Sequence, residues 1–310
     1  MLTNLPEPPP ASTSSIDYEE LGARLRAYRI GASLQAENIA EMLDVSRAAI
    51  YRMEQGKIVK IETLERLAQL LGTSIASLLG VEVEYYSTAL GFLERLRQIE
   101  QDTERIVAHF TPVSLLLASD EYLDYLRIML LEAAASNSDK KEALSASHAA
   151  EVASILTISH ERKALFMQKR PSIVSLIGLR ELERFLQTGL IGKLGLDESI
   201  RQQRIQAARN EVKRIADLME QEPMHIKIAL VEDAMPATAF ELLYRGNRTI
   251  LSVSPFRLGE MPSIRNGVAT VTAAQEPVRL YENMVDQLWK SAHKGKIGAA
   301  HLRKLLKRTQ

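Results

Sequence analysis

Arg47, Ala48, Tyr51 and Arg52 follow one another at steps of one, three and one residues. In a helix these steps place all four side chains on one face. Arginine can donate two parallel hydrogen bonds to the acceptors on a guanine edge, and alanine is small enough to contact a thymine methyl group. Tyr51 and Arg52 lie one turn later, where a side chain can reach a base or a phosphate. The set predicts contact with double-stranded DNA.

A helix that carries these residues is indicated by its ends and by its apolar face. Ser46 offers an N-cap hydroxyl, and Gly56 stands where a C-cap favours a residue that tolerates positive φ. Ile50 and Met53 must then face inward. A preceding apolar helix ends near Leu43, so the sequence predicts a helix, a short turn and a second helix that can enter the major groove.

Charge is concentrated where this contact is predicted. Residues 16–80 hold eight Lys or Arg and nine Asp or Glu, so the segment as a whole is not basic. The stretch 46–60, however, contains Arg47, Arg52, Lys57 and Lys60 against one acidic residue. The two lysines follow the helix and suit phosphate contacts, which position a protein without reading sequence. We expect modest non-specific affinity and reliance on base contacts and dimerisation.

The segment resembles the helix-turn-helix domain of the XRE family, which includes the phage Cro and repressor proteins. The resemblance covers residues 16–80, about a fifth of the chain. It rests on Ile39-Ala40, Leu43, Val45-Ser46, Ile50, Arg52-Met53-Glu54, Gly56-Lys57, Leu64, Leu67-Ala68, Leu71-Gly72-Thr73-Ser74 and Leu78-Leu79. It implies that the residues contacting DNA are Ser46, Arg47, Ala48 and Arg52. It also implies a structural role for Glu54, which would hold the recognition helix to its neighbours.

Two positions depart from the family pattern. Gln35 and Ala36 stand where the family has a Ser or Thr cap followed by a phosphate-binding Gln. Asp44 replaces the usual turn glycine, and Asp accepts a left-handed conformation better than most residues. We expect the fold to form with a weaker phosphate contact at the start of that helix.

Residues 81–160 are predicted to form a helical connector and dimerisation region. From Tyr85 to Phe110 apolar residues repeat in an unbroken four-three spacing, which is typical of a coiled-coil seam flanked by charges. A dimerising helix and a long helix packed on its own C-terminal domain both fit this pattern. The residues assigned to dimerisation are Phe92, Leu96, Ile99 and Ile106.

Residues 161–310 are predicted to form an α/β or α+β domain with a small mixed sheet. Short β-branched runs at 172–177, 225–231, 239–244, 248–253 and 268–272 predict strands, and Arg-Gly-Asn at 245–247 predicts a hairpin. Helical patterns span 199–220 and 277–293. Alternating strands and helices favour this class of fold. The domain is expected to sense a small-molecule or protein effector.

One stretch has residue types that could do phosphoryl chemistry. His225-Ile-Lys227, followed after four residues by Glu232, is similar to the phospholipase D motif, in which Asp stands where this chain has Glu. That motif needs two copies, and a second is not found, so an ordinary strand is the favoured interpretation. The six histidines do not pair at ligand spacing. We therefore expect no catalytic residue, metal or cofactor, and no enzymatic activity.

Composition limits the remaining classes. The chain has no cysteine, which excludes disulfides and thiolate zinc sites and fits a reducing cytoplasm. No apolar run approaches the length of a membrane span. Residues 1–15 read as a disordered Pro/Ser arm without the features of a secretory signal.

The sequence thus predicts a cytoplasmic transcription regulator that binds a pseudo-palindromic operator as a homodimer and does not bind membranes. Its C-terminal domain would sense a ligand or protein. Two alternatives stay open: an antitoxin-like DNA-binding protein that holds a partner protein, and a phospholipase-D-like phosphodiesterase fused to a DNA-binding domain.

Overall fold

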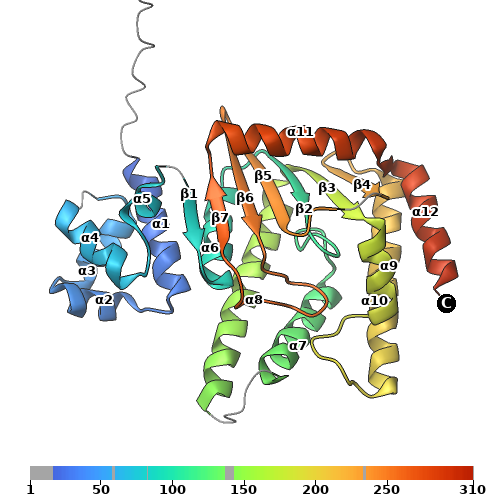
Figure 1. Cartoon of the computed structure of the whole chain (residues 1–310), viewed down its shortest axis with the longest axis horizontal. Coiled ribbons are helices and arrows are strands. Elements are labelled where there is room, and N and C mark those ends of the chain that lie inside the picture. Colours follow the sequence, from blue (N-terminus) through green and yellow to red (C-terminus); the bar gives the residue numbers. More distant parts are fainter. Residues whose placement is uncertain (1–16, 58–59, 82, 137–142, 233–234, 310) are drawn as a thin grey trace, which may run out of the picture.

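The fold is known from a computed structural model of the chain, which describes residues 17–57, 60–81, 83–136, 143–232 and 235–309. The arm predicted for residues 1–15 lies outside these ranges. Within the described residues, a helical head precedes a larger body built on one mixed sheet (Figure 1). We call α1 to α5 the head, and everything from β1 onward the body.

The head consists of short amphipathic helices around one core. Apolar residues at three- and four-residue steps turn one face of each helix inward, and the most deeply buried include Leu21, Leu25, Ile39 and Leu78. The helices are α1 (Tyr18–Gly31), α2 (Ala36–Leu43), α3 (Arg47–Glu54), α4 (Ile61–Leu70) and α5 (Ile75–Leu79).

The body contains an eight-stranded sheet among the described residues, in the order β1-β7-β6-β5-β2-β3-β4-β8. β2, β3 and β4 run parallel to one another, and the other neighbours are antiparallel. The strands are β1 (Val83–Tyr86), β2 (Arg105–His109), β3 (Ser172–Gly178), β4 (Ile226–Val231), β5 (Ala239–Arg245), β6 (Arg248–Ser254), β7 (Ala269–Thr272) and β8 (His293–Lys294).

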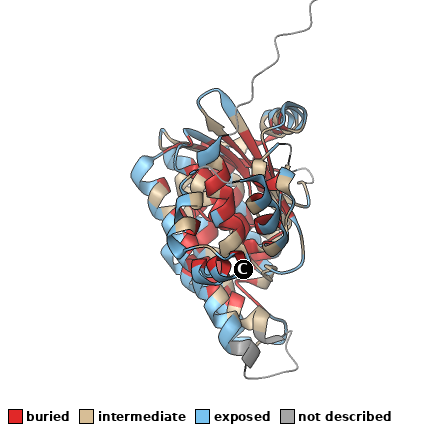
Figure 2. Ribbon diagram, turned by 90° about the vertical axis from the view of Figure 1, so that its left-hand side faces the viewer, coloured by how far each residue is buried: buried red, intermediate tan, exposed pale blue. Residues whose placement is uncertain are grey.

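Helices cover both faces of this sheet. One face packs on α6 (Ala89–Glu100), α7 (Asp120–Ser136), α8 (Ala143–Lys169), α9 (Leu179–Thr188), α10 (Glu198–Gln221) and α12 (Gly295–Arg308). The other face packs on α11 (Gln275–Ser291). Buried residues concentrate between these layers (Figure 2). Because parallel strands need long crossovers, the helices between β2, β3 and β4 follow from the topology.

The predicted fold class is confirmed: a helical head is followed by a mixed α/β body. The predicted strands correspond to β3 through β7, and β5 and β6 form the expected hairpin through Gly246. The sheet is larger than predicted, because β1 and β2 also belong to it.

The predicted seam from Tyr85 to Phe110 is wrong as a continuous helix. Tyr85 lies in β1 and Ile106 in β2, and only α6 between them is helical. The four-three spacing arises because residues 83–109 pass from strand to helix to strand, and each element turns an apolar face into the same core. Residues 81–160 are therefore not a separate helical connector.

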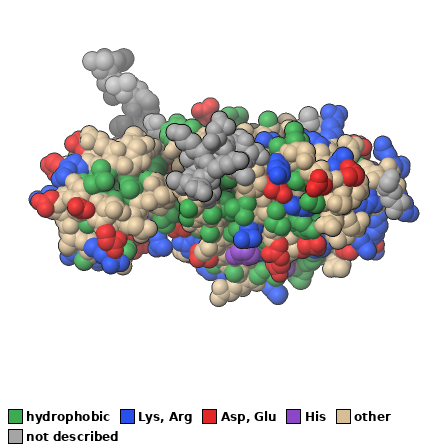
Figure 3. All heavy atoms as spheres, turned by 90° about the horizontal axis from the view of Figure 1, so that it is seen from below, with side chains coloured by type: hydrophobic (Ala, Val, Ile, Leu, Met, Phe, Trp, Pro, Cys, Tyr) green, Lys and Arg blue, Asp and Glu red, His purple; other side chains and the backbone are tan. Residues whose placement is uncertain are grey.

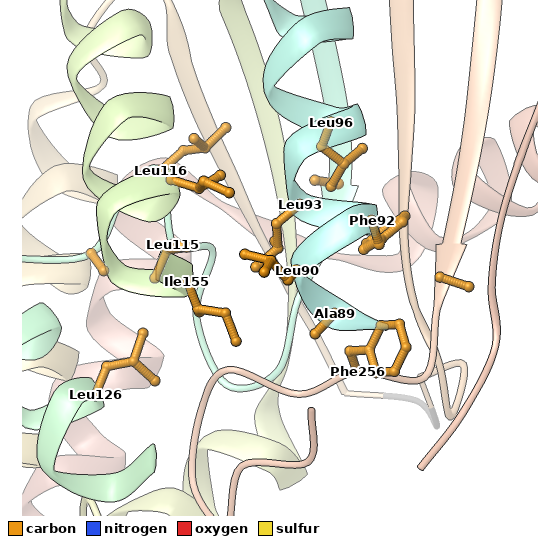
Figure 4. Close-up of a cluster of buried hydrophobic side chains, with 14 of the residues drawn as sticks. Ala89, Leu90, Phe92, Leu93, Leu96, Leu115, Leu116, Leu126, Ile155 and Phe256 are labelled. Carbon is orange, nitrogen blue, oxygen red and sulfur yellow. The ribbon is translucent and has the colours of Figure 1, made fainter. Parts of the chain in front are cut away.

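The side chains assigned to dimerisation are buried within this one chain. Phe92, Leu96, Ile99 and Ile106 are each at most 3% exposed. Figure 4 shows Leu90 and Leu93 of α6 directed toward neighbouring elements that carry Leu116 and Ile155. These positions leave no surface for a second copy, so this dimer seam is a wrong assignment.

Each C-terminal helix turns an apolar face into the body. Met284, Leu288 and Trp289 of α11 pack toward the sheet, whereas Leu280 is exposed. Leu302 and Leu305 of α12 are buried against the rest of the body. No helix in the described ranges is both long enough and apolar enough to cross a lipid bilayer.

Candidate nucleic-acid interface

The turn between α2 and α3 is set by three local features. Asp44 adopts the left-handed conformation, with φ 56° and ψ 49°, as its replacement of glycine required. Ser46 Oγ accepts a hydrogen bond of 3.2 Å from the Ala49 backbone N–H and so caps α3. Gly56 follows α3 at φ +80°. The helix-turn-helix geometry predicted from the sequence is thus present.

The outer face of α3 presents the predicted DNA-contacting residues to solvent. Ile50 is buried and Met53 half-buried, so α3 has one anchored face. All predicted contact residues are exposed, and they are Ser46, Arg47, Ala48, Tyr51, Arg52, Lys57 and Lys60. In Figure 3 acidic and basic side chains are interspersed on the visible face of the head, in agreement with its balanced charge.

Arg47 is held by two neighbours on the surface. Its Nε lies 2.7 Å from Glu37 Oε1 of α2, and its Nη2 donates a 3.2 Å hydrogen bond to Tyr51 Oη. The guanidinium also lies 5.3 Å from the centre of the Tyr51 ring. Arg47 remains 61% exposed and Glu37 50% exposed, so solvent screens this ion pair. A guanine edge could therefore replace Glu37 as the partner of Arg47.

The inner side of α3 is fixed to α1. Glu54 accepts hydrogen bonds of 2.5 and 3.1 Å from Arg29, and its side chain is only 7% exposed. A Cβ at Gly22 would lie 2.5 Å from the Glu54 carbonyl oxygen and 2.7 Å from the Gly56 nitrogen. Glu54 thus has the structural role that the resemblance implied, and α1 positions the C-terminal end of α3 closely.

The start of α2 and the segment after α3 surround the recognition face. The Gln35 backbone N–H donates to Asn38 Oδ1 at 3.2 Å, so Asn38 contributes to the cap that the family builds with Ser or Thr. Lys60 is the N-cap residue of α4, and Lys57 lies three residues after the end of α3. Both lysines lie beside the recognition helix in sequence and are free to reach phosphates.

Residues 20–79 match the family described as helix-turn-helix domain. This part of the chain is a helix-turn-helix domain. The match and the geometry cover the same helices, α1 to α5, and DNA is therefore the partner that the domain indicates. No curated protein matches the chain as a relative.

The helix-turn-helix domain is packed directly against the body. α1 crosses α6 at a pair of glycines, and a Cβ on Gly31 would lie 2.9 Å from the Gly91 Cα. The rings of Tyr28 in α1 and Tyr86 in β1 are stacked with centroids 4.7 Å apart. The apolar cores of head and body form one continuous cluster.

Buried ion pairs reinforce this junction. Arg95 of α6 donates hydrogen bonds to Glu84 at 2.8 and 2.9 Å and to Glu20 of α1 at 2.7 Å. Arg245, at the end of β5, donates to Glu20 at 2.9 Å. Burial acts to raise the pKa of Glu20, but Arg95 and Arg245 outweigh it and lower the pKa to about 2.

Arg24 completes the network from the head side. Its Nε and Nη2 donate to the carbonyl oxygens of Leu78 and Leu79 at 2.7 and 3.0 Å, which ties α1 to the end of α5. Arg24 also lies 3.5 Å from Glu84. The sequence analysis treated the charges of residues 85–110, Arg95 among them, only as the flank of a seam, and it did not single out Arg24 or Glu84. We find no sequence signal that would have identified them.

The body contains a pocket at the carboxyl ends of its parallel strands. Its volume is about 240 Å³, and it is bordered by the segments after β2, β3 and β6 and by residues 235–237. Glu181 lines it, and one buried oxygen of Glu181 has no hydrogen-bond partner among the described residues. Carboxyl ends of parallel strands are where open α/β sheets commonly bind ligands.

A smaller apolar cavity adjoins this pocket and reaches α6. The two share Phe110, Thr111, Ser254, Phe256 and Leu258 in their walls. The smaller cavity is also lined by side chains of the helix that carries the head, and these are Ala89, Phe92 and Leu93. The pocket is therefore connected through packed side chains to the junction with the helix-turn-helix domain.

The residues similar to the phospholipase D motif do not come together. His225 precedes β4 and its ring packs near Phe166 of α8, with centroids 6.3 Å apart. Lys227 is exposed near the start of β4, whereas Glu232 follows the end of that strand. An extended strand separates His225 from Glu232 by about 20 Å. The ordinary-strand interpretation accounts for this stretch.

Proposed function

We propose that this protein is a sequence-specific regulator of transcription that reads DNA through α3. The observation that carries the proposal is that one face of this helix is exposed and the opposite face is packed in the head. Arg47, Ala48, Tyr51 and Arg52 face solvent, while Ile50 and Glu54 hold the opposite side in the head. A helix held in this way can enter the major groove without losing its packing.

Dimerisation is part of the proposal on physical grounds. One helix-turn-helix buries too little surface to select a site in a genome, since specific interfaces usually need about 1,000 Å² or more. Two heads related by a two-fold axis would read half-sites about one helical turn apart, or a multiple of it. Because the predicted seam is buried, the contact between copies must lie on another surface.

We further propose that the body senses a small-molecule effector through the pocket beside Glu181. Support comes from the buried unpartnered carboxylate oxygen and from the apolar cavity that continues to α6. A ligand there would press on the walls shared with α6 and could alter how the head is held. This favours a sensor over an antitoxin-like interaction protein, and the proposal includes no catalytic step.

Selection from fragmented genomic DNA tests the proposed reading of sequence. The full chain is incubated with the fragments, recovered, and the bound DNA is sequenced. We expect enrichment of a motif with two-fold symmetry, and its loss in a variant with Arg47→Ala and Arg52→Ala together. Equal recovery of all fragments by the unaltered protein would contradict the proposal.

The sensor proposal is tested separately by a thermal-shift screen of small polar metabolites. A true effector should raise the melting temperature of the full chain, because a ligand that binds only the folded state stabilises it. Glu181→Gln should abolish that rise while leaving DNA binding in the absence of ligand unchanged. A rise of equal size in Glu181→Gln would place the ligand elsewhere.

A further inference from the structure

Two histidines and a glutamate converge on the surface of the body, far along the chain from one another. Glu232 Oε1 lies 3.0 Å from His293 Nε2 and 3.5 Å from His301 Nδ1. The two imidazole rings have centroids 4.0 Å apart. One ligand atom from each residue can be chosen so that all lie within 4.8 Å of one another. These contacts are separate from the DNA-reading face and from the pocket beside Glu181.

The topology explains how residues so distant in sequence meet. His293 lies in β8 opposite Leu230 of β4, and Glu232 follows two positions further along the same strand direction. Gly295, at φ +54°, begins α12 immediately after β8. A Cβ at Gly298 would lie 2.9 Å from the His293 carbonyl oxygen, so the first turn of α12 packs on β8.

His301 is three residues after Gly298 and thus on the same face of α12. This placement brings its ring over His293, at a sequence separation of eight. The sequence analysis expected no two histidines at ligand spacing. This expectation is wrong, because His293 and His301 lie side by side in the fold. That expectation considered spacing within one helix or one strand, whereas this pair spans the junction between β8 and α12.

Two of the three distances between the donor atoms are close to those around a tetrahedral metal ion, and all three lie within 4.8 Å. Bonds of 2.0–2.1 Å to a tetrahedral zinc ion place neighbouring ligand atoms roughly 3.3 Å apart. The separations of 3.0 and 3.5 Å from Glu232 to the two imidazole nitrogens lie on either side of that value. Both nitrogens lie within 3.5 Å of one carboxylate oxygen, and an ion bound by the three side chains would take the place of these direct contacts.

We propose that Glu232, His293 and His301 bind a divalent first-row transition-metal ion, with Zn²⁺ as the representative case. Two imidazoles and a carboxylate suit Zn²⁺, Ni²⁺, Co²⁺ or Cu²⁺, whereas Mg²⁺ and Ca²⁺ prefer oxygen ligands alone. The side chains are 57%, 30% and 38% exposed, so an ion can enter from solvent. Three protein ligands leave a coordination position open for water or for an external ligand.

An ion at this site would join the end of β4 to β8 and α12. β8 has only two residues, and within the described chain it pairs with β4 alone. A metal bridge from Glu232 to His293 and His301 would fix this short edge strand and hold α12 at its middle. Metal binding should therefore stabilise the folded body, since the unfolded chain has no preformed site.

Calorimetric titration of the full chain with Zn²⁺ tests the proposal. The protein is used without a histidine tag and after treatment with a chelator. We expect one Zn²⁺ per chain. His301→Ala and Glu232→Gln should each lower the affinity at least about tenfold, and His293→Ala with His301→Ala should abolish binding. His160→Ala, an exposed histidine of α8 outside the cluster, should leave binding unchanged.

Two further measurements keep the result unambiguous. Co²⁺ should give a visible absorption spectrum typical of a nitrogen- and oxygen-coordinated ion in the unaltered protein, and not in the double variant. Saturating Zn²⁺ should raise the melting temperature of the unaltered protein and of His160→Ala. Absence of stoichiometric binding, or equal binding by the double variant, would overturn the proposal, leaving a surface ion pair only.

Discussion

Arg47 combines exposure with a surface partner that DNA can replace. Glu37 and Tyr51 orient its guanidinium beside α3, yet most of the side chain faces solvent. Lys57 is also exposed and has the character of a phosphate-binding residue. The two cations should therefore contribute to DNA binding in different ways, because one can hold a base edge and the other a backbone oxygen.

Replacing each cation with alanine separates these contributions. Arg47→Ala should cost about 1–3 kcal/mol of binding free energy at the selected site and relax preference at one base position. Lys57→Ala should weaken binding to all sequences alike and lower the slope of log affinity against log salt by about 0.9. Fluorescence anisotropy over a series of salt concentrations measures both. Equal losses on selected and random DNA for both variants would contradict the role of Arg47.

The residues that contact DNA could be predicted from the sequence, whereas the buried charged residues could not. Ser46, Arg47 and Gly56 follow local rules of capping and helix faces, so their roles could be predicted. Arg95 and Glu84 are each under a tenth exposed, although charged residues are normally placed on surfaces. Their burial depends on partners distant in the chain, which no local pattern contains.

At glycine positions, the backbone of α1 lies in close contact with the backbones of α3 and α6. Gly22 brings α1 against the end of α3, and Gly31 with Gly91 brings α1 against α6. The head is thus joined to the body along the whole length of α1. A signal from the body would reach α3 through shifts of α1 and α6, since among the described residues no separate helix connects the head to the body.

Gly22→Ala tests the close approach of α1 and α3. In an open helix this substitution stabilises by up to about 1 kcal/mol, because alanine has the higher helix propensity. Here the added methyl would meet the Glu54 carbonyl oxygen and the Gly56 nitrogen, so we expect destabilisation of about 1–3 kcal/mol. Chemical denaturation followed by circular dichroism measures the change, and a gain in stability would show that the two helices are not in contact.

The wrong prediction of one helix over residues 85–110 shows that the bounds of helices and strands were harder to predict than which residues face inward. The apolar residues between Tyr85 and Phe110 face inward as the pattern predicted, with the exception of Tyr85, which is 53% exposed. A four-three spacing over a strand, a turn and a helix cannot be distinguished from a heptad repeat by hydrophobicity alone. Pairing of β1 with β7, nearly two hundred residues away, decides the outcome.

The whole molecule is a head and a body that share one apolar core and a buried charge network. Glu20 is the residue through which α1, α6 and the end of β5 meet, by way of Arg95 and Arg245. Removing the Glu20 carboxylate should therefore weaken the attachment of the head to the body. The network also makes the attachment of the head sensitive to acid.

Glu20→Gln tests this network through its pH dependence. A pKa of about 2 in the folded state, against 4.5 ordinarily, means that Glu20 stabilises the fold above about pH 4.5 and loses this effect as the pH falls toward 2. The variant should be about 3 kcal/mol less stable at neutral pH, and its deficit should shrink over that acidic range. Glu19→Gln, its exposed neighbour, is the matched control and should lose much less stability at neutral pH than Glu20→Gln.

Dimerisation belongs to the same scale and is measured by sedimentation. On a two-fold operator we expect a protein mass of twice the 34.7 kDa chain. Because Leu96 and Ile99 are buried in the body, replacing them with Glu should unfold the protein rather than merely separate two copies. One chain per operator at saturation would contradict the dimeric proposal.

Photo-crosslinking from the outer face of α3 tests most directly whether this helix reads DNA. A photoreactive residue is introduced at Ala48, which is exposed in the first turn of α3, and separately at Met167, which is 57% exposed on α8 of the body. Irradiation of the full chain on its selected operator should join DNA to position 48 and not to position 167. Crosslinking from position 167 alone, or equally from both, would contradict the assignment of α3 as the recognition helix.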